Sequence, residues 1–356
     1  MRHGAVATIA CDESASEGEN LVASTHPVFV HGSTDLAIDD AQEFIAALRA
    51  ATNAQAREMK SSAVLRPRNR DALLRALTSL EGHGNIYFVD KSYFLTAKLI
   101  ALTVAEFGER LGLDVHHSGF GRYMADLLHR DAEAAVGTTS WNAVLSTFNN
   151  VVRSYVREGS AAPAVEFFYE ALADARKRCS NLRVALILEE VWEARDLIRA
   201  YEGATPVELR ELDPIAPSLA AVSMTWHMRL GDVPFEFLHD TYSGLSPGVC
   251  KAIVASSRAP LALGEISLPR GDLRGIRLID SKSDARVQVA DILAGVGREV
   301  ARMAAAGTFD DDLQTTVHQM LDFNVMSSGG SPLDRLVEQA PLDYFTAWKA
   351  RGANRT

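Results

Sequence analysis

Cysteine is scarce in this chain, with three residues, Cys11, Cys179 and Cys250, among 356. Their wide spacing matches no metal-ligand motif, and an odd number does not build a framework of paired disulfides. Disulfides are rare in proteins of the reducing cytoplasm. The cysteine usage therefore predicts a cytoplasmic protein.

Long hydrophobic runs are also missing. No apolar stretch approaches the roughly 20 residues that a membrane-spanning helix needs. Met1-Arg2-His3-Gly4 leads into a short strand-like run that Cys11-Asp12-Glu13 interrupts, and a secretory signal peptide has a different pattern. We therefore expect no membrane partner.

Two glycine-rich phosphate-binding motifs are absent. The sequence contains neither Gly-x-x-x-x-Gly-Lys-Ser/Thr nor Gly-x-Gly-x-x-Gly, the loops that cradle phosphates in P-loop and dinucleotide-binding proteins. A nucleotide-binding enzyme or small-molecule phosphohydrolase of these classes is therefore not favoured. A serine or cysteine hydrolase is not favoured either. Ser246-Pro247 suits the N-cap and first position of a helix.

The composition present is that of a globular protein, with 47% hydrophobic and 23% charged residues. A net charge of −10 argues against a surface coated in basic groups. It does not exclude nucleic acid, because a local basic patch is enough to bind phosphates. The length allows one domain with a large insertion, or two domains.

The first ninety residues predict an α/β beginning. Asp39-Asp40 suits the start of a helix over Ala41–Thr52. Runs rich in Val, Ile, Phe and Tyr favour strands. Such runs are Val6–Ala10, Leu21–Ser33 (a strand or hairpin) and Asn85–Lys91. A strand is also expected to begin at Glu58–Ser62, with Glu58 and Lys60 on the same side. A second helix is expected over Asp71–Leu80.

The middle of the chain changes in texture. From Tyr93 to Tyr201 helical periodicity dominates, which predicts a helical insertion. We therefore expect four segments, which are a core (1–92), a helical insertion (93–212), a second core part (213–306) and a helical tail (307–356) that includes a helix near Leu342–Lys349. His116, His117 and His129 match no zinc motif and are expected at the surface or in the core.

Strand texture returns after the insertion, at Leu219–Trp226, Pro234–Asp240 and Ile276–Asp280. Ser283 or Asp284 is then a suitable N-cap. A long amphipathic helix follows from Ala285 to Met303. Gln288 and Asp291 share one face of it because they are three residues apart.

Acidic residues follow several expected strands. They are Asp12 with Glu13, Asp90, Asp240 and Asp280, with Glu58 near a further strand and Asp291 on the late helix. Each has an ordinary explanation, because strand-ending aspartates often cap helices and Asp291 suits the solvated edge of an amphipathic helix. Together, acids converging at strand ends favour a two-metal phosphodiesterase site.

The same residues carry a family resemblance. Asp12-Glu13-Ser14, Glu58-x-Lys60, His239-Asp240 and Asp280-Ser281 followed by Gln288-Val289-Ala290-Asp291 resemble a bacterial domain-of-unknown-function family, number thirty-eight hundred. Most of the chain is covered, with the helical middle as an insertion. The resemblance implies a ribonuclease H-like fold, a mixed sheet flanked by helices, and members often lie near mobile elements and phage-defence genes. Ala15 stands where that family commonly has Gly, which changes turn flexibility and not ligand chemistry.

The resemblance also implies site roles. Asp12, Asp240 and Asp291 would bind Mg²⁺ or Mn²⁺, with Asp280 and Glu58 as further ligands or supporting groups. Lys60 would neutralise a scissile phosphate, and Gln288 would orient a carboxylate or bind a nucleic-acid backbone. The first functional hypothesis is therefore a Mg²⁺- or Mn²⁺-dependent nuclease that cuts DNA or RNA. It also requires a basic groove beside the acids, for which the sequence offers Lys60, Arg66, Arg68, Arg70 and Lys91.

One alternative stays open. The core is then a catalytically inactive ribonuclease H-like scaffold whose helical insertion binds a protein partner or nucleic acid, and the acids are caps and surface charges. A homo-oligomer is compatible with either hypothesis. Fold analogy alone does not establish catalysis.

Overall fold

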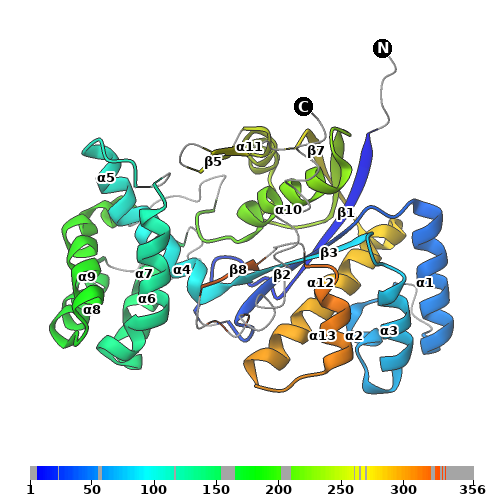
Figure 1. Ribbon diagram of the computed structural model, residues 1–356, viewed down its shortest axis with the longest axis horizontal. Coiled ribbons are helices and arrows are strands. Elements are labelled where there is room, and N and C mark those ends of the chain that lie inside the picture. The colour runs from blue at the N-terminus through cyan, green and yellow to red at the C-terminus, as the bar shows by residue number, and fades with distance from the viewer. Residues whose placement is uncertain are drawn as a thin grey trace, which may run out of the picture.

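A computed structural model describes residues 6–22, 24–54, 58–115, 118–153, 165–201, 210–259, 261–263, 266–268, 271–321, 325–328, 331 and 333 (Figure 1). The expected helix near Leu342–Lys349, as well as His116 and His117, lies outside these residues. None of the described helices combines the length and the apolarity needed to cross a bilayer.

A mixed sheet of six strands forms the centre, in the order β7-β4-β1-β2-β3-β8. The first three strands along the chain are an antiparallel meander, and β4 and β7 then run parallel to β1. The strands span Ala7–Ser14 (β1), Val28–Thr34 (β2), Gly84–Asp90 (β3), Phe235–Asp240 (β4), Leu273–Ile279 (β7) and Val325–Met326 (β8). The chain is therefore an α/β protein.

Helices cover both faces of this sheet. One face packs on α1 (Ile38–Thr52), α3 (Arg70–Thr78), α12 (Ala285–Ala305) and α13 (Asp311–His318), and the other on α4 (Lys91–Ile100), α10 (Ile215–Leu230) and α11 (Pro247–Arg258). Alternating strand residues feed the two cores: Val28 and Val30 of β2 lie in the α12 core, and Phe29 lies in the α10 core.

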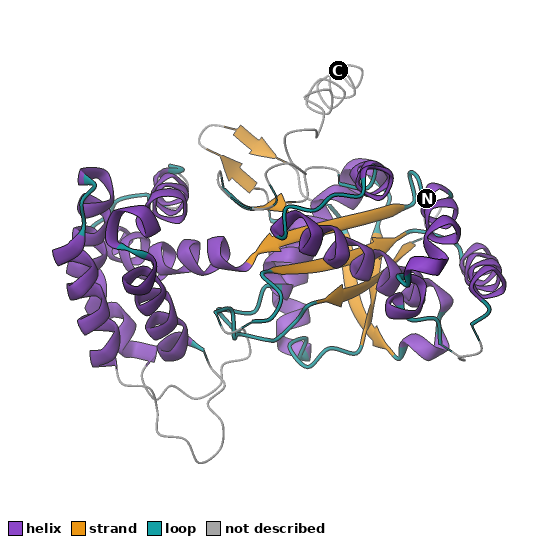
Figure 2. Cartoon of the chain, turned by 90° about the horizontal axis from the view of Figure 1, so that it is seen from below, coloured by secondary structure: helices purple, strands orange, loops and turns teal. Residues whose placement is uncertain are grey.

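A helical lobe stands beside the sheet (Figure 2). It begins with α4, directly after β3, because the Asp90 carboxylate accepts the backbone N–H groups of Ser92 and Tyr93 and so caps the helix. Beyond α4 it contains η2 (Ala101–Ala105, π-helical), α5 (Glu106–Arg110), α6 (Phe120–Val136), α7 (Thr138–Val152), α8 (Val165–Arg178), α9 (Leu182–Ala194) and η3 (Arg195–Tyr201). A helical middle segment was the expectation.

Shorter elements complete the description. They are α2 (Ser61–Val64), η1 (Pro67–Asn69), the antiparallel pair β5 (Leu261–Leu263) and β6 (Ile266–Leu268), and η4 (Ser281–Ser283). The late helix predicted from Ala285 is α12, and Asp284 is its N-cap because its carboxylate accepts the Arg286 N–H.

Three predicted strands are wrong. Leu219–Trp226 lies within α10, where Leu219, Val222 and Trp226 all pack into the core at helical spacing. Leu21 and Val22 are not in a strand, and Leu21 N–H is donated to the Asn149 side chain of the lobe. The segment Glu58–Lys60 is irregular, because tertiary bonds to α12 take the place of strand pairing.

Close packing of α12 on the sheet depends on Gly32 in β2. A Cβ at this position would stand 2.4 Å from the Ala290 carbonyl oxygen and 2.6 Å from the Ala294 nitrogen. Both atoms belong to the backbone of α12, so they have no rotamer with which to move away. The helix can therefore lie this close to β2 only because residue 32 has no side chain.

Replacing Gly32 with Ala tests this constraint. We expect Gly32→Ala to lower the free energy of unfolding by about 1–3 kcal/mol, the usual cost of overpacking a core, measured by urea denaturation. Gly275→Ala in the edge strand β7 is the matched control, because a Cβ there meets nothing within 4 Å. Equal stability of the two variants would contradict the close-packing argument.

Candidate functional site

Four carboxylates meet at the edge of the sheet where β1 and β4 end. Asp12 and Glu13 belong to β1, Asp240 is the last residue of β4, and Asp291 projects from α12. Parallel pairing of β1 with β4 brings their carboxyl ends to the same edge. Asp12 is 5% exposed, and burial followed by the charges of Glu13, Asp291 and Asp240 raises its pKa to about 9.

Asp291 is held by the residue that opens α2. Ser61 donates its backbone N–H to Asp291 Oδ2 over 2.9 Å, and its hydroxyl donates to Oδ1 over 3.3 Å. Burial raises the pKa of Asp291 although these bonds and Lys60 act in the opposite direction. Gly295, one turn further along α12, leaves room for Ser61, because a Cβ there would stand 2.4 Å from the Ser61 hydroxyl.

Ser281 connects Asp240 to a fifth acid, Glu58. Its backbone N–H donates to Asp240 Oδ1 over 3.1 Å, and its hydroxyl donates to Glu58 Oε1 over 2.8 Å. Glu58 also forms an ion pair with Lys60, with 2.5 Å between Oε1 and Nζ. The structure therefore places Glu58 and Lys60 beside the carboxylates, and the charges of Asp291, Glu58 and Asp12 help to raise the pKa of Lys60.

Gln288 ties these segments to α12. Its Oε1 accepts the Met59 N–H over 3.0 Å, and its Nε2 donates to the Ser281 carbonyl over 3.0 Å. The residue is 6% exposed. Its amide group thus holds the Glu58 loop and the Ser281 turn in place. Since Glu58 belongs to that loop, this agrees with the predicted role of Gln288 in orienting a carboxylate. Contact with a nucleic-acid backbone stays a prediction.

Asp280 and Lys91, which were also predicted as site residues, have local partners of their own. Asp280 caps η4 by accepting the Lys282 N–H, and its side chain is 63% exposed. Lys91 is 2% exposed and donates to the Ser24 hydroxyl over 2.5 Å, and burial lowers its pKa to about 8. Lys91 is therefore buried and does not line an open groove, contrary to the prediction.

The expected basic groups are divided. Arg70 binds Asp310 and Asp312 and so connects α3 to the start of α13. Asp310 also caps α13 by accepting the Leu313 N–H. Arg66 and Arg68 are exposed on the turn between α2 and α3. Of the groove residues, Lys60 is the one whose charge acts on Asp12 and Asp291.

Two residues of the site, Glu13 and Asp213, were given no role on the basis of the sequence. Glu13 lies beside Asp12, and burial raises its pKa to about 7. Asp213 precedes α10, accepts the Tyr242 hydroxyl over 2.9 Å, and burial raises its pKa. The pair Asp12-Glu13 was the available signal for Glu13, but strand alternation assigns neighbours to opposite faces. For Asp213 no sequence signal existed.

The donor set suits a hard divalent cation. Within the described ranges, no three His, Cys, Asp or Glu side chains already stand as a formed coordination group. Nevertheless, buried carboxylates that repel one another are stabilised when a cation sits between them, and Mg²⁺ prefers oxygen ligands. Glu13 Oε2 is buried without a hydrogen-bond partner. The residues therefore fit the metal that the resemblance implies.

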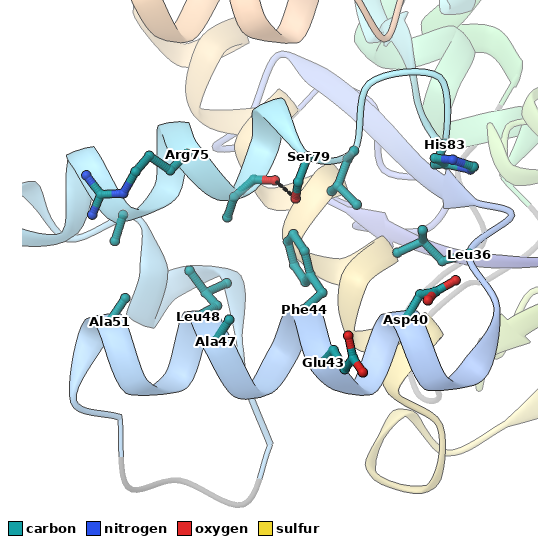
Figure 3. Close-up of a pocket in the computed structure, with 13 residues that line it drawn as sticks. Leu36, Asp40, Glu43, Phe44, Ala47, Leu48, Ala51, Arg75, Ser79 and His83 are labelled. Carbon is teal, nitrogen blue, oxygen red and sulfur yellow. Dashed lines mark hydrogen bonds between the residues drawn. The ribbon is translucent and has the colours of Figure 1, made fainter.

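Two other features do not supply a competing centre. Residues 244–248 match the letters of a Gly-x-Ser-x-Gly nucleophile elbow, but the Ser246 hydroxyl accepts the Val249 N–H as the N-cap of α11. A groove of about 560 Å³ lies between α1 and α3 (Figure 3). Its lining contains Phe44, Ala47 and Arg75, and none of the clustered acids.

Comparisons with protein-family models, with curated proteins and with solved structures found no match to this chain. The family resemblance therefore stays a prediction, and the geometry of the site carries the functional argument.

The raised pKa of Asp12 predicts how stability depends on pH. Its ordinary pKa is 3.8 and its folded pKa is about 9, so the folded chain binds the proton more tightly. The resulting stabilisation is complete below pH 3.8 and is lost as pH rises toward 9. In EDTA, we expect the free energy of unfolding to fall between pH 5 and pH 9, measured by urea denaturation.

Asp12→Asn is the matched variant for this prediction. It keeps the shape and removes the charge, so the pH dependence should flatten. At pH 9 the variant should exceed the wild type by more than about 1.4 kcal/mol, the equivalent of one pKa unit. If the free energy of unfolding depends on pH in the same way in both proteins, ionisation of Asp12 does not destabilise the fold and the prediction is wrong.

Proposed function

We propose that this protein is a Mg²⁺- or Mn²⁺-dependent nuclease with a ribonuclease H-like core, hydrolysing phosphodiester bonds of nucleic acid. The observation that carries the proposal is the burial of Asp12 among Glu13, Asp240 and Asp291, each of which raises its pKa. A protein that needed these groups only as caps or surface charges would not gather them in one buried place.

The topology supports the proposal. An antiparallel meander of β1, β2 and β3 is followed by β4 and β7 parallel to β1, with helices on both faces. The acids lie at the ends of β1 and β4 and on the closing helix α12. This is the mixed sheet with converging acids that a ribonuclease H-like enzyme requires.

The residues divide into ligands and supporting groups. Asp12, Asp240 and Asp291 would hold the metal, with Glu58 as a further oxygen donor. When bound, two divalent cations stabilise the attacking and leaving oxygens of an in-line displacement. Ser61 and Ser281 fix the orientation of Asp291 and Asp240 by the hydrogen bonds described above.

Lys60 is the group proposed to face the substrate phosphate. Its side chain is 46% exposed, and Glu58 is its partner. A phosphate placed beside the metal ligands would compete for Lys60 and release Glu58 toward the metal. Lys282, Arg66 and Arg68 are exposed, and each lies close in sequence to a site residue. Their positive charges would add to that of Lys60 in binding a nucleic-acid backbone.

A binding scaffold is the second candidate, and the helical lobe favours it. Leu111, Leu113, Phe120 and Tyr123 are each more than half exposed, and the rings of Phe120 and Tyr123 stack with centroids 6.2 Å apart. Exposed apolar groups gathered within a short segment are typical of surfaces that bind a protein partner or unstacked bases.

Substitution of the acids separates the two candidates. We expect Asp12→Asn, Asp240→Asn and Asp291→Asn each to reduce cleavage of single-stranded, duplex or hybrid substrates at least about 100-fold, because each removes a metal ligand. The assay is substrate cleavage in millimolar Mg²⁺ or Mn²⁺, with far-UV circular dichroism to show that the variants fold.

Asp280→Asn is the matched control. It removes an aspartate charge from the same part of the chain, but the Asp280 side chain is 63% exposed and caps η4. This variant should keep its cleavage activity within about threefold of the wild type, because substitutions of exposed residues usually have small effects. If all three cluster variants stay fully active, the nuclease proposal is wrong.

A further inference from the structure

Two unpaired polar atoms lie close together near the ends of β1 and β4. Glu13 is the last residue but one of β1, and His239 is the last but one of β4. The Nε2 atom of His239 lies 3.9 Å from Oε2 of Glu13. Both atoms are buried, and neither has a hydrogen-bond partner among the described residues.

The partner of Nδ1 shows which nitrogen of the His239 ring carries the hydrogen. Nδ1 lies 2.9 Å from the backbone carbonyl oxygen of Asp240. A carbonyl oxygen only accepts, so Nδ1 must carry the hydrogen. The ring is fully buried, which favours its neutral form. In a neutral imidazole with a hydrogen on Nδ1, Nε2 presents a lone pair.

The contact therefore gives neither atom a hydrogen bond, because a separation of 3.9 Å is too long for one. A cation between the atoms would satisfy both. Metal–nitrogen and metal–oxygen distances of about 2.0–2.2 Å place two ligands of one ion roughly 3–4 Å apart, which matches this spacing.

We propose that Glu13 and His239 form a second, oxygen–nitrogen metal position that takes a first-row transition-metal ion in preference to Mg²⁺. It adjoins the all-oxygen position at Asp12, Asp240 and Asp291, and this inference rests on the proposed metal-dependent function. Imidazole nitrogen is a ligand of transition metals, whereas Mg²⁺ selects oxygen.

The surroundings agree with such a position. The hydrogen bond from His239 Nδ1 to a backbone carbonyl is the arrangement that usually orients a metal-binding histidine. The charge of Glu13 helps to raise the pKa of Asp12, so the two positions lie close together.

His31 supplies a matched control. Its ring is fully buried in β2, its centroid lies 5.4 Å from that of His239, and both of its nitrogens lack a hydrogen-bond partner in the described structure. It shares the environment of His239. It lacks the backbone hydrogen bond that orients His239, and the proposal assigns it no ligand role.

The test is electron paramagnetic resonance of Mn²⁺ bound to the full chain. We expect the wild type to bind two Mn²⁺ ions and electron spin echo modulation to show coupling to ¹⁴N. His239→Gln should lose the coupling and one ion, and His31→Phe should keep both. Glu13→Gln should weaken the second ion at least about tenfold, the effect of disturbing a metal's ligand sphere.

The contrary results are distinct. Bound Mn²⁺ without nitrogen coupling in the wild type overturns the mixed position and leaves the all-oxygen centre intact. Coupling that survives His239→Gln and vanishes in His31→Phe overturns the assignment to His239. No bound Mn²⁺ at millimolar concentration overturns the proposed function as well. The wild-type spectrum decides the question even if a variant does not fold.

Discussion

Mutual repulsion of buried carboxylates is the constraint on which this structure depends. Asp12, Glu13, Asp240 and Asp291 share the edge where β1 and β4 end, and burial, followed by the charges of the other three acids, raises the pKa of Asp12 to about 9. Such an arrangement costs stability when no cation is bound. It persists because hydrogen bonds from Ser61 and Ser281 fix two of the acids.

The position of α12 converts the fold into a site. Gly32 lets the helix backbone lie against β2, and Gly295 leaves room for Ser61 beside Asp291. Gln288 then connects the same helix to the Glu58 loop and the Ser281 turn. Segments more than two hundred residues apart in the sequence are thereby held by one helix.

The sequence predicted the parts of the fold with clear local signals. The helix from Ala285, the strand ending in Asp240 and the helical middle are strongly periodic, and the structure contains them. Leu219–Trp226 misled because its apolar, β-branched residues suit a buried strand as well as a buried helix. The burial of Lys91 and the partners of Gln288 depend on tertiary contacts that no local pattern contains.

The most direct test of the central claim is anomalous X-ray scattering from crystals grown with Mn²⁺. We expect an anomalous peak at coordination distance, about 2.0–2.3 Å, from oxygens of Asp12, Asp240 and Asp291. Ordered carboxylates with no peak between them, in crystals that contain the ion, would contradict it. The cluster would then be a buried acidic feature of a scaffold and not a metal centre.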